Sequence, residues 1–338
     1  MRADPARPGN TWERVLQLPP EVLVANYHVG LDWVNLFVIR AGEIHPYRIP
    51  LTRLELPRLD GLAPGRSRGL GAPSTSGLPD NSPLIEPIIE HAEGASLIYL
   101  VPHGPLEHYP LHAMAMGGKR LIDYCPVIYL PCLSMMPPAE PAPVSSWQAL
   151  VMGNMTMDLS GAAGEAEAVA RLFGTKAYVG EEATLKRLFS EAPGKNILHI
   201  AGHGFFDPSQ PLASGIPFPD GILTVRHVYE ELKLDNCLVV LSGCVTGLGD
   251  ERPGEGFSSL IGAFFSAGAR GLLVSLWNVD DAATTEFMIG VYQRVLAQGS
   301  SFPLAFQGSY MDLRRVSEAQ HVLSAPFYWA PFKPVGSW

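Results

Sequence analysis

A histidine and a cysteine, each at the end of an apolar run of strand length, are the residues of this chain best suited to do chemistry. Residues 196–204 read NILHIAGHG, and residues 238–244 read LVVLSGC. Parallel strands present reactive side chains at their carboxyl ends, so two neighbouring strands of this kind would bring His203 and Cys244 together. An imidazole can take the proton of a thiol and later return it to a leaving amine. The pattern predicts a catalytic pair in which Cys244 is the nucleophile and His203 is the base.

Glycine stands beside both of these residues and favours close approach of the backbone to a reacting group. Gly204 follows the histidine, and Gly243 precedes the cysteine. The backbone N–H groups of Gly204 and Cys244 are therefore predicted to face the oxyanion of a tetrahedral intermediate. Acyl transfer by a thiol and an imidazole needs no metal and no cofactor, and the sequence predicts none.

Further motifs extend this pattern in both directions along the chain. They are SLWNVDD at 275–281, VPHGPL at 101–106, YLP at 129–131 and FYWAPF at 327–332. Together with the His-Gly and Ser-Gly-Cys motifs, they make residues 83–336 resemble the CHAT family of caspase-like cysteine peptidases, in the clan of caspases, metacaspases and separases. Gly202 and Gly243 stand where alanine or threonine is expected, and the helical repeats that usually precede the domain are missing. Neither departure removes a catalytic atom.

The resemblance implies a cysteine endopeptidase that makes limited, specific cuts in a protein partner, in bacterial defence, signalling or regulated death. A gasdermin-like pore former is one substrate that it suggests. Because the repeats are missing, a separate sensor or ligand, or self-processing, is expected to switch the activity on. Two alternatives stay open: a catalytically silent caspase-like scaffold that only binds its partner, and an amidase or acyl-transfer enzyme with the same pair.

Two segments are candidates for substrate binding. The loop 247–256 carries Asp250 and Glu255, and an acid in the pocket for the residue before the scissile bond would favour lysine or arginine; a solvated acidic loop is the alternative. In related peptidases the other segment pairs with the extended substrate backbone, so its residues are candidates for β-augmentation. They are Ser275, Leu276 and Trp277, and core packing is the competing interpretation for the tryptophan.

Apolar runs of strand length alternate with helical periodicity from residue 83 onward, which predicts an α/β fold. The resemblance makes this a caspase-like, mainly parallel sheet with helices on both faces. A smaller N-terminal α/β region precedes it, with a β-hairpin over 21–27 and 33–40 and a further strand at 43–50. The predicted divisions are 1–82 (hairpin region and Gly/Pro/Ser-rich loop), 83–145 (N-terminal, non-catalytic part of the CHAT domain) and 146–338 (catalytic part).

Composition agrees with a globular chain, since 47% of the 338 residues are hydrophobic and 17% are charged. A net charge of −9 disfavours direct binding of nucleic acid. Four cysteines without CxxC spacing indicate neither a zinc site nor a disulfide framework, and the first residues do not resemble a signal peptide, so a cytoplasmic location is expected. Arg270 divides the apolar stretch 256–279 into a helix and a strand too short to cross a membrane, so no membrane insertion is expected.

The remaining histidines and the one serine-hydrolase motif receive structural interpretations. His199, inside the same apolar run as His203, is predicted to be a hydrogen-bonded core residue. His103 falls in the part that the resemblance makes non-catalytic, and His108 and His112 are interpreted as structural. The GRSRG motif at 65–69 lies in an aperiodic loop rather than between a strand and a helix, so it is not interpreted as a nucleophile elbow.

Overall fold

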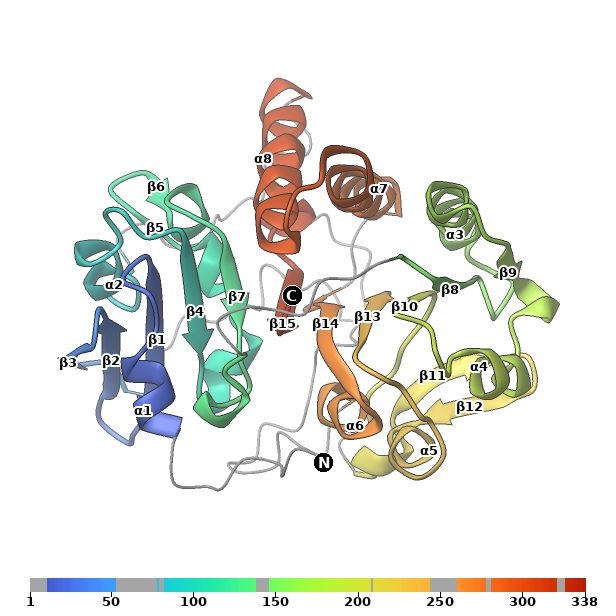
Figure 1. Cartoon of the computed structure of the whole chain (residues 1–338), viewed down its shortest axis with the longest axis horizontal. Helices are drawn as coiled ribbons and strands as arrows, with labels where there is room; N and C mark the ends of the chain where they lie inside the picture. The colour runs from blue at the N-terminus through green and yellow to red at the C-terminus, as the bar shows by residue number, and fades with distance from the viewer. Residues whose placement is uncertain are drawn as a thin grey trace.

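The computed structural model describes residues 11–52, 78, 82–137, 146–207, 209–243, 260–277, 281–320 and 326–338. Its centre is one eleven-stranded sheet that extends across the molecule in Figure 1. In spatial order the strands are β3 (Glu43–Ile49), β2 (Val34–Arg40), β1 (Val22–Val29), β4 (Leu97–Val101), β7 (Val127–Tyr129), β15 (Phe332–Gly336), β14 (Ala269–Ser275), β13 (Cys237–Ser242), β10 (Ile197–Ala201), β8 (Ala149–Gly153) and β9 (Ala177–Val179). Two small hairpins accompany the sheet: β5 (Ala115–Met116) with β6 (Lys119–Arg120), and β11 (Gly215–Phe218) with β12 (Gly221–Thr224).

Nine of the eleven strands form two parallel sets that meet at one antiparallel pair, β14 with β15. β1, β4, β7 and β15 run in one direction, and β14, β13, β10, β8 and β9 run in the other. β14 and β15 pair antiparallel from Gly271↔Gly336 to Ser275↔Phe332. The carboxyl ends of the two sets therefore lie on opposite edges of the sheet. The predicted mainly parallel α/β sheet is confirmed.

The predicted N-terminal hairpin is present and forms part of the same sheet. β1 and β2 pair antiparallel, and the N–H of Gly30 donates to the carbonyl of Trp33 at 2.8 Å in the turn between them. β3 adds the third predicted strand beside β2. Because β1 also pairs in parallel with β4, the hairpin region continues the sheet of the following segment. The predicted division of the chain at 82 and at 145 stays a prediction.

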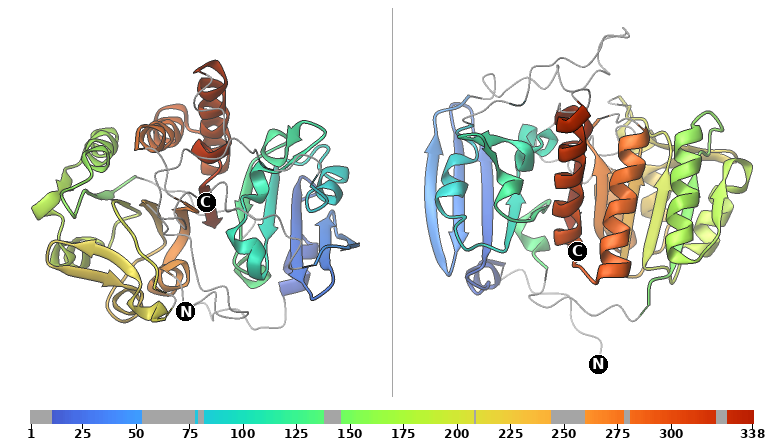
Figure 2. Two further views of the ribbon diagram at one scale, coloured as in Figure 1. Left: turned by 180° about the vertical axis from the view of Figure 1, so that it is seen from behind. Right: turned by 90° about the horizontal axis from the view of Figure 1, so that it is seen from above.

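Helices cover both faces of the sheet. They are α1 (Thr11–Leu16), α2 (Glu86–Glu90), α3 (Ser160–Phe173), α4 (Leu185–Glu191), α5 (Val225–Glu230), α6 (Leu260–Ala267), α7 (Asp281–Gln298) and α8 (Phe302–Gln320). In Figures 1 and 2, α3, α7 and α8 lie side by side over one face, and α4, α5 and α6 lie over the other face of the C-terminal half. Among the described residues, no helix is both long enough and apolar enough to span a membrane.

Local sequence explains where several helices begin and end. α3 buries one apolar face through Ala166, Val169 and Ala170. α3 ends at Gly174, whose φ of 61° is the left-handed conformation that glycine adopts without strain. α4 begins at the N-cap Thr184, whose hydroxyl accepts from the N–H of Arg187 at 3.2 Å.

The elements that were not predicted from the sequence include α1, α8, β15 and the β11–β12 hairpin. β15 reads FKPVG, and a lysine and a proline are not typical of a central strand. Its place in the sheet depends on β14 on one side and β7 on the other, which are distant in sequence. Tertiary pairing therefore overrides the weak local preference of this segment.

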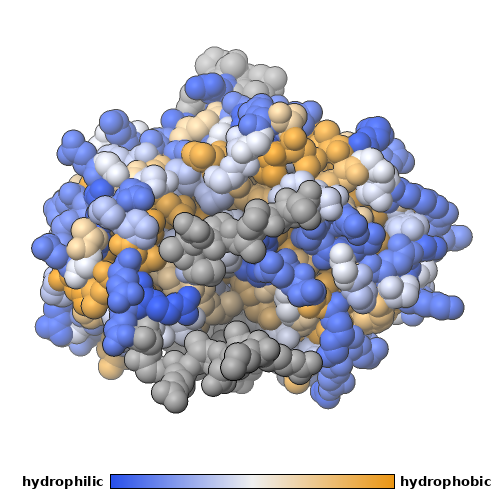
Figure 3. Space-filling model, viewed as in Figure 1, coloured by the Kyte–Doolittle hydropathy of each residue, from blue (hydrophilic) through white to orange (hydrophobic). Residues whose placement is uncertain are grey.

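The surface agrees with the low fraction of charged residues in the chain, which is 17%. The face in Figure 3 shows hydrophilic residues around its edge and apolar residues exposed in patches between them. Large apolar side chains with at least a third of their surface exposed include Trp12, Leu31, Ile44, Phe205 and Ile222. They come from both halves of the chain rather than from one segment.

Candidate active site

The ends of β10 and β13 form the centre of the candidate site. The two strands pair in parallel from Ile197↔Leu238 to Ala201↔Ser242. One residue further, the N–H of Gly202 donates to the carbonyl of Ser242 at 2.9 Å. Because β8, β13 and β14 run in the same direction as β10, their carboxyl ends lie at the same edge of the sheet. The structure thus brings the two sequence motifs together at neighbouring strand ends.

Gly202 and Gly243, the two departures from the family pattern, have a structural reason. A Cβ on Gly243 would lie 1.8 Å from the carbonyl oxygen of Gly202, which no real contact allows. A Cβ on Gly202 would lie 2.5 Å from Cε of Met155, the far end of a flexible side chain. The backbones therefore approach each other at a distance that requires glycine at 243 and only favours it at 202.

His203 projects from the end of β10 and is partly open to solvent. Its side chain is 37% exposed, and its Nε2 lies 3.3 Å from Oδ2 of Asp158. The Thr156 hydroxyl, which donates to Oδ1, and then the imidazole of His203 lower the pKa of Asp158. The carboxylate therefore stays charged at neutral pH and can orient the ring.

Asp158 was not predicted from the sequence, and the loop that holds it explains its position. The loop follows β8 and leads into α3. Asn154, at its start, has a φ of 50°; its N–H donates to the carbonyl of Ala201 at 2.9 Å, and its Oδ1 accepts from the N–H of Leu159 at 2.8 Å. These two hydrogen bonds fix both ends of the loop beside β10. An asparagine directly after a buried strand was the available signal, since asparagine tolerates the left-handed region and bonds to nearby backbone.

Gly204, the predicted oxyanion donor, follows His203 outside regular secondary structure. In the part of the chain that the structure describes, its N–H donates no hydrogen bond. The next residue, Phe205, is held by Gly215: the N–H of each donates to the carbonyl of the other, at 2.9 and 3.1 Å. The backbone at Gly204 is thus fixed between β10 and the β11–β12 hairpin.

Three of the predicted site residues lie outside the described residues: Cys244, Asp250 and Glu255. Gly243, the residue directly before the cysteine, follows the end of β13 and is the last residue of the described range 209–243. The nucleophile and the acidic pocket therefore stay predictions.

The predicted substrate-binding residues at the end of β14 are buried. Ser275, Leu276 and Trp277 are each less than 5% exposed. The N–H of Leu276 donates to the carbonyl of Pro331 at 2.9 Å, so this group already has a partner. Their side chains belong to the core in this structure, and pairing of their backbone with a peptide stays a prediction.

The other histidines make contacts within the protein. His199 is fully buried and lies 3.2 Å from the hydroxyl of Tyr292, which confirms the predicted hydrogen-bonded core histidine. His112 is also buried, with its Nδ1 2.8 Å from the hydroxyl of Tyr129. No group of three or more His, Cys, Asp or Glu side chains within the described ranges is arranged to hold a metal ion.

The N-terminal half contains a second histidine and cysteine at the ends of adjacent parallel strands. β4 and β7 pair up to Leu100↔Tyr129, and three residues further along each strand stand His103 and Cys132. Both line a pocket of about 490 Å³. Nδ1 of His103, however, accepts from the N–H of Val29 at 3.2 Å, so the proton of the neutral ring is on Nε2. With Nδ1 occupied and Nε2 protonated, neutral His103 has no nitrogen available as a base.

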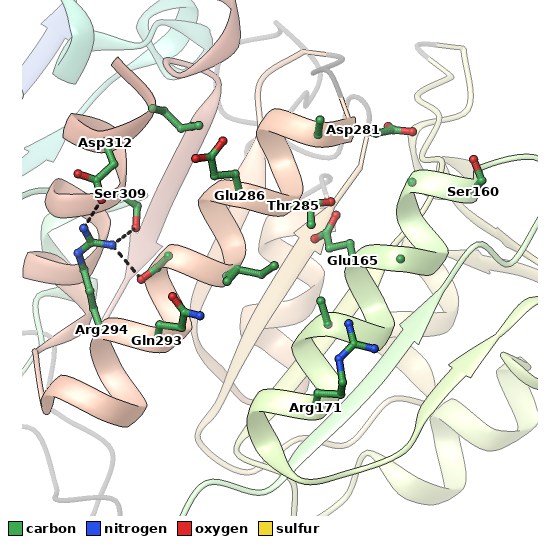
Figure 4. A pocket seen from close by; sticks show the side chains of 17 residues that line it. Ser160, Glu165, Arg171, Asp281, Thr285, Glu286, Gln293, Arg294, Ser309 and Asp312 are labelled. Atoms are coloured by element: carbon green, nitrogen blue, oxygen red, sulfur yellow. Dashed lines mark hydrogen bonds and ion pairs between the residues drawn. The ribbon is translucent and has the colours of Figure 1, made fainter. Parts of the chain in front are cut away.

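A groove of about 970 Å³ lies between α3, α7 and α8 (Figure 4). Polar side chains along it include Arg171, Glu286 and Gln293, and Arg294 forms an ion pair with Asp312. A much smaller cavity of about 40 Å³ shares Glu165 and Asp281 with the groove and reaches Gly202, Ser242 and Gly243. Glu165 and Asp281 thus line both the groove between the helices and the cavity at the strand ends.

Comparison with known proteins agrees with this arrangement. The model of the CHAT domain family matches residues 82–337. The structure is similar to the separase–securin complex of Saccharomyces cerevisiae, with a TM-score of 0.62 and 10% identity over 96% of this chain; it spans only 30% of the matched chain of that complex. It is also similar to the Arg-specific cysteine proteinase gingipain R (RgpB) of Porphyromonas gingivalis, with a TM-score of 0.52, 11% identity, and coverage of 76% of this chain and 67% of that one. None of the curated protein sequences matches this chain. At such low identity, the two structures show the shared fold.

Proposed function

Because this chain belongs to the CHAT domain family of caspase-like cysteine peptidases, we propose that it is a cysteine endopeptidase in which His203 is the base and Cys244 is the nucleophile. The family covers residues 82–337 and includes both motifs. A peptidase of this type cuts the peptide bond through a thioester and needs no resident metal or cofactor.

The register of β10 and β13 is the observation that carries the proposal. Ala201 and Ser242 are the last paired residues, and counting two residues further along each strand gives His203 and Cys244. Chain connectivity keeps consecutive Cα atoms about 3.8 Å apart, so Cys244 cannot be far from Gly243. Gly243 in turn lies against Gly202, the residue before the histidine. The pairing register thus supports a histidine and a cysteine on neighbouring strand ends.

The contact with Asp158 indicates which ring nitrogen acts as the base. When Nε2–H of His203 donates to the carboxylate, the neutral ring carries its free lone pair on Nδ1. Nδ1 then takes the proton of the Cys244 thiol, and the thiolate attacks the carbonyl carbon of the scissile peptide bond. The imidazolium is stabilised by Asp158 and gives its proton to the leaving amine.

The oxyanion and the second half of the reaction use the same groups. The N–H of Gly204 is the described donor that supports an oxyanion hole, and the N–H of Cys244 is the proposed second donor. Water then attacks the thioester, with His203 again accepting a proton, and the free thiol is restored. The reaction involves no oxidation or reduction, and the bond that breaks is the peptide bond of the substrate.

The substrate we propose is a protein partner that is cut at a limited number of sites. A gasdermin-like pore former is one candidate, and a separate sensor or ligand is the proposed switch, in a cytoplasmic role in bacterial defence or regulated death. A basic residue before the cut is proposed because Asp250 and Glu255 follow the nucleophile in sequence. A peptidase of the same fold, gingipain R, is described as Arg-specific, which supports this preference.

Substitution of the two residues tests the proposal. Cys244→Ala and His203→Ala are each expected to abolish cleavage of a peptide library, measured by mass spectrometry, without lowering the Tm. The double variant should be no worse than either single one, because the two residues act as a unit. Retained turnover in Cys244→Ala would refute the mechanism.

The second histidine offers a matched control. His103→Ala removes an imidazole at the same kind of strand end in the N-terminal half, but one whose Nδ1 is occupied by the N–H of Val29. Cleavage should continue in this variant. If His103→Ala lost activity with an unchanged Tm, the catalytic base would lie in the N-terminal half and the proposed role of His203 would be wrong.

A further inference from the structure

A buried polar cluster lies beneath the proposed catalytic strand ends. His199 on β10 is fully buried, and its Nδ1 lies 3.2 Å from the hydroxyl of Tyr292 on α7. Its Nε2 lies 3.1 Å from Oε1 of Glu165 on α3, whose side chain is 4% exposed. Two helices thus place a phenol and a carboxyl group on either side of one imidazole, four residues before His203 in the sequence.

The direction of the protons in this cluster follows from burial. Burial, and then the nearby Glu165 and Cys237, raise the pKa of Tyr292 well above its usual range, so its hydroxyl keeps its proton. When that hydroxyl donates to Nδ1 of His199, the remaining ring proton sits on Nε2 and faces Glu165. An N–H facing a carboxylate is the favourable arrangement, whereas a ring lone pair facing it would be repelled.

Three polar atoms of the cluster nevertheless lack a hydrogen-bond partner within the described part of the chain. They are Oε1 of Glu165, Nε2 of His199 and Oγ of Ser242. The first two are close in distance but are not aligned for a hydrogen bond. Buried polar atoms are nearly always bonded to protein or to ordered water. Glu165 and Ser242 line the same cavity, so their unpaired atoms indicate a bound molecule there.

The cavity beside these atoms has the size and lining for water. Its volume is about 40 Å³, and a buried site of about 10–15 Å³ with two to four polar partners is enough for one water molecule. Glu165 offers an acceptor and Ser242 offers a hydroxyl that can donate or accept.

We propose that this cavity is a binding site for an ordered water molecule and that, through it, Glu165, which lies against His199, acts as a positioning residue for the ends of β10 and β13. The role rests on the proposed function, because the strand ends are the segments that carry His203 and Cys244. Gly202 and Gly243 form part of the wall of the cavity.

The position of Glu165 explains how the helices take part. The side chain extends from α3 toward α7 in Figure 4, at the base of the groove between them. It therefore contacts the groove on one side and the cavity under the strand ends on the other. A change in how α3 packs against α7 would move the Glu165 side chain and, through the cavity, would reach the proposed catalytic pair.

The test measures the reactivity of Cys244 in the full-length chain, with iodoacetamide as the probe. The rate of alkylation at Cys244 is followed by peptide mass spectrometry as a function of pH. Glu165→Leu should move the midpoint of this profile toward that of an unperturbed thiol, near about 8.5, by on the order of one pH unit. Glu165→Gln keeps the shape and the hydrogen-bonding capacity, so it should retain most of the wild-type profile. Ser242→Ala, which removes one partner of the water, should fall between them.

A control separates positioning from loss of stability. Val24→Ala truncates a buried residue of β1 in the other half of the sheet and lowers the Tm without touching the cluster. A profile that shifts as much in Val24→Ala as in Glu165→Leu at equal loss of Tm overturns the positioning role. An unchanged profile in both Glu165→Leu and Ser242→Ala also overturns it.

Two further measurements distinguish this inference from the proposed function. His203→Ala should shift the same profile; if it does not, the catalytic pair is refuted and the positioning role with it. If His203→Ala shifts the profile and the Glu165 variants do not, only the positioning role is lost. A high-resolution crystal structure should show a water molecule within hydrogen-bond distance of Glu165 and Ser242, and a dry cavity would overturn the water site.

Discussion

Substitution of Gly243 by alanine tests how closely the two strand ends must approach. In the structure, the new Cβ would lie 1.8 Å from the carbonyl oxygen of Gly202 and 3.0 Å from its carbonyl carbon. Contacts below 3.0 Å are essentially absent from real structures, so the strand ends must separate by more than about 1 Å. Neither glycine has a positive φ, so space alone decides the outcome.

The cost of this separation can be worked out from the contacts that it breaks. The hydrogen bond from the N–H of Gly202 to the carbonyl of Ser242 is 2.9 Å long and would be lost. Leaving buried backbone groups unpaired costs about 1–3 kcal/mol, and strain from overpacking adds about 1–3 kcal/mol. We expect the free energy of unfolding to fall by about 2–6 kcal/mol and, for a chain of 338 residues, the Tm by roughly 3–8 °C. A displacement of about 1 Å between base and nucleophile should lower cleavage about a hundredfold.

Gly202→Ala is the matched control for this experiment. Its Cβ would meet only Cε of Met155, which can rotate away, so stability and activity should change little. Calorimetry gives the Tm, and cleavage of a peptide library gives the activity of both variants. If Gly243→Ala keeps the wild-type Tm and activity, the strand ends are not held as closely as argued.

Three further predictions concern the thiols, a buried lysine and the acidic loop. In a short pulse of iodoacetamide, Cys244 should be alkylated first and Cys132 more slowly; Cys125 and Cys237 should react last, because burial raises the pKa of their thiols to about 11 and about 12. Burial lowers the pKa of Lys333 from 10.5 to about 8, so the unfolded chain binds the proton more tightly between these values and stability should rise across that pH range. In urea unfolding, the free energy of unfolding of the wild type should rise by about 3 kcal/mol over that range relative to Lys333→Met. The rise is smaller by the amount with which the carbonyl of Glu107, 2.6 Å from Nζ, favours the charged form of the lysine. No relative rise would contradict the burial argument. Asp250→Lys should raise the barrier by about 2–4 kcal/mol for cutting after lysine or arginine and far less after leucine, as proteome cleavage profiles would show; equal slowing of all substrates would retire the acidic pocket.

Hydrophobic patterning determined most of the elements. Short aliphatic runs flanked by glycine and proline predicted the central strands, because strands buried on both faces must be apolar along their whole length. The hairpin at the N-terminus was predictable from its alternating segments and the turn at Gly30. β15 was not, because Lys333 and Pro334 are poor strand residues whose place depends on partners far away in sequence.

Residue types and their positions in the sequence also predicted the candidate pair, His203 and Cys244, and the structural role of His199. A histidine and a cysteine at the ends of apolar runs are visible without a fold, and so is the contrast between His203 after the run and His199 inside it. Family resemblance added the expectation of a caspase-like sheet, which the structure confirms.

Only the tertiary structure decided which side chains surround that pair. Asp158 and Glu165 reach β10 from a loop and a helix that precede it by more than 30 residues, and no spacing in the sequence predicts such contacts. The same is true of Gly243, whose need for glycine arises from a carbonyl on another strand. Sequence periodicity specifies which face of each element is buried, whereas contacts between elements depend on packing distances that are set when all of the elements come together.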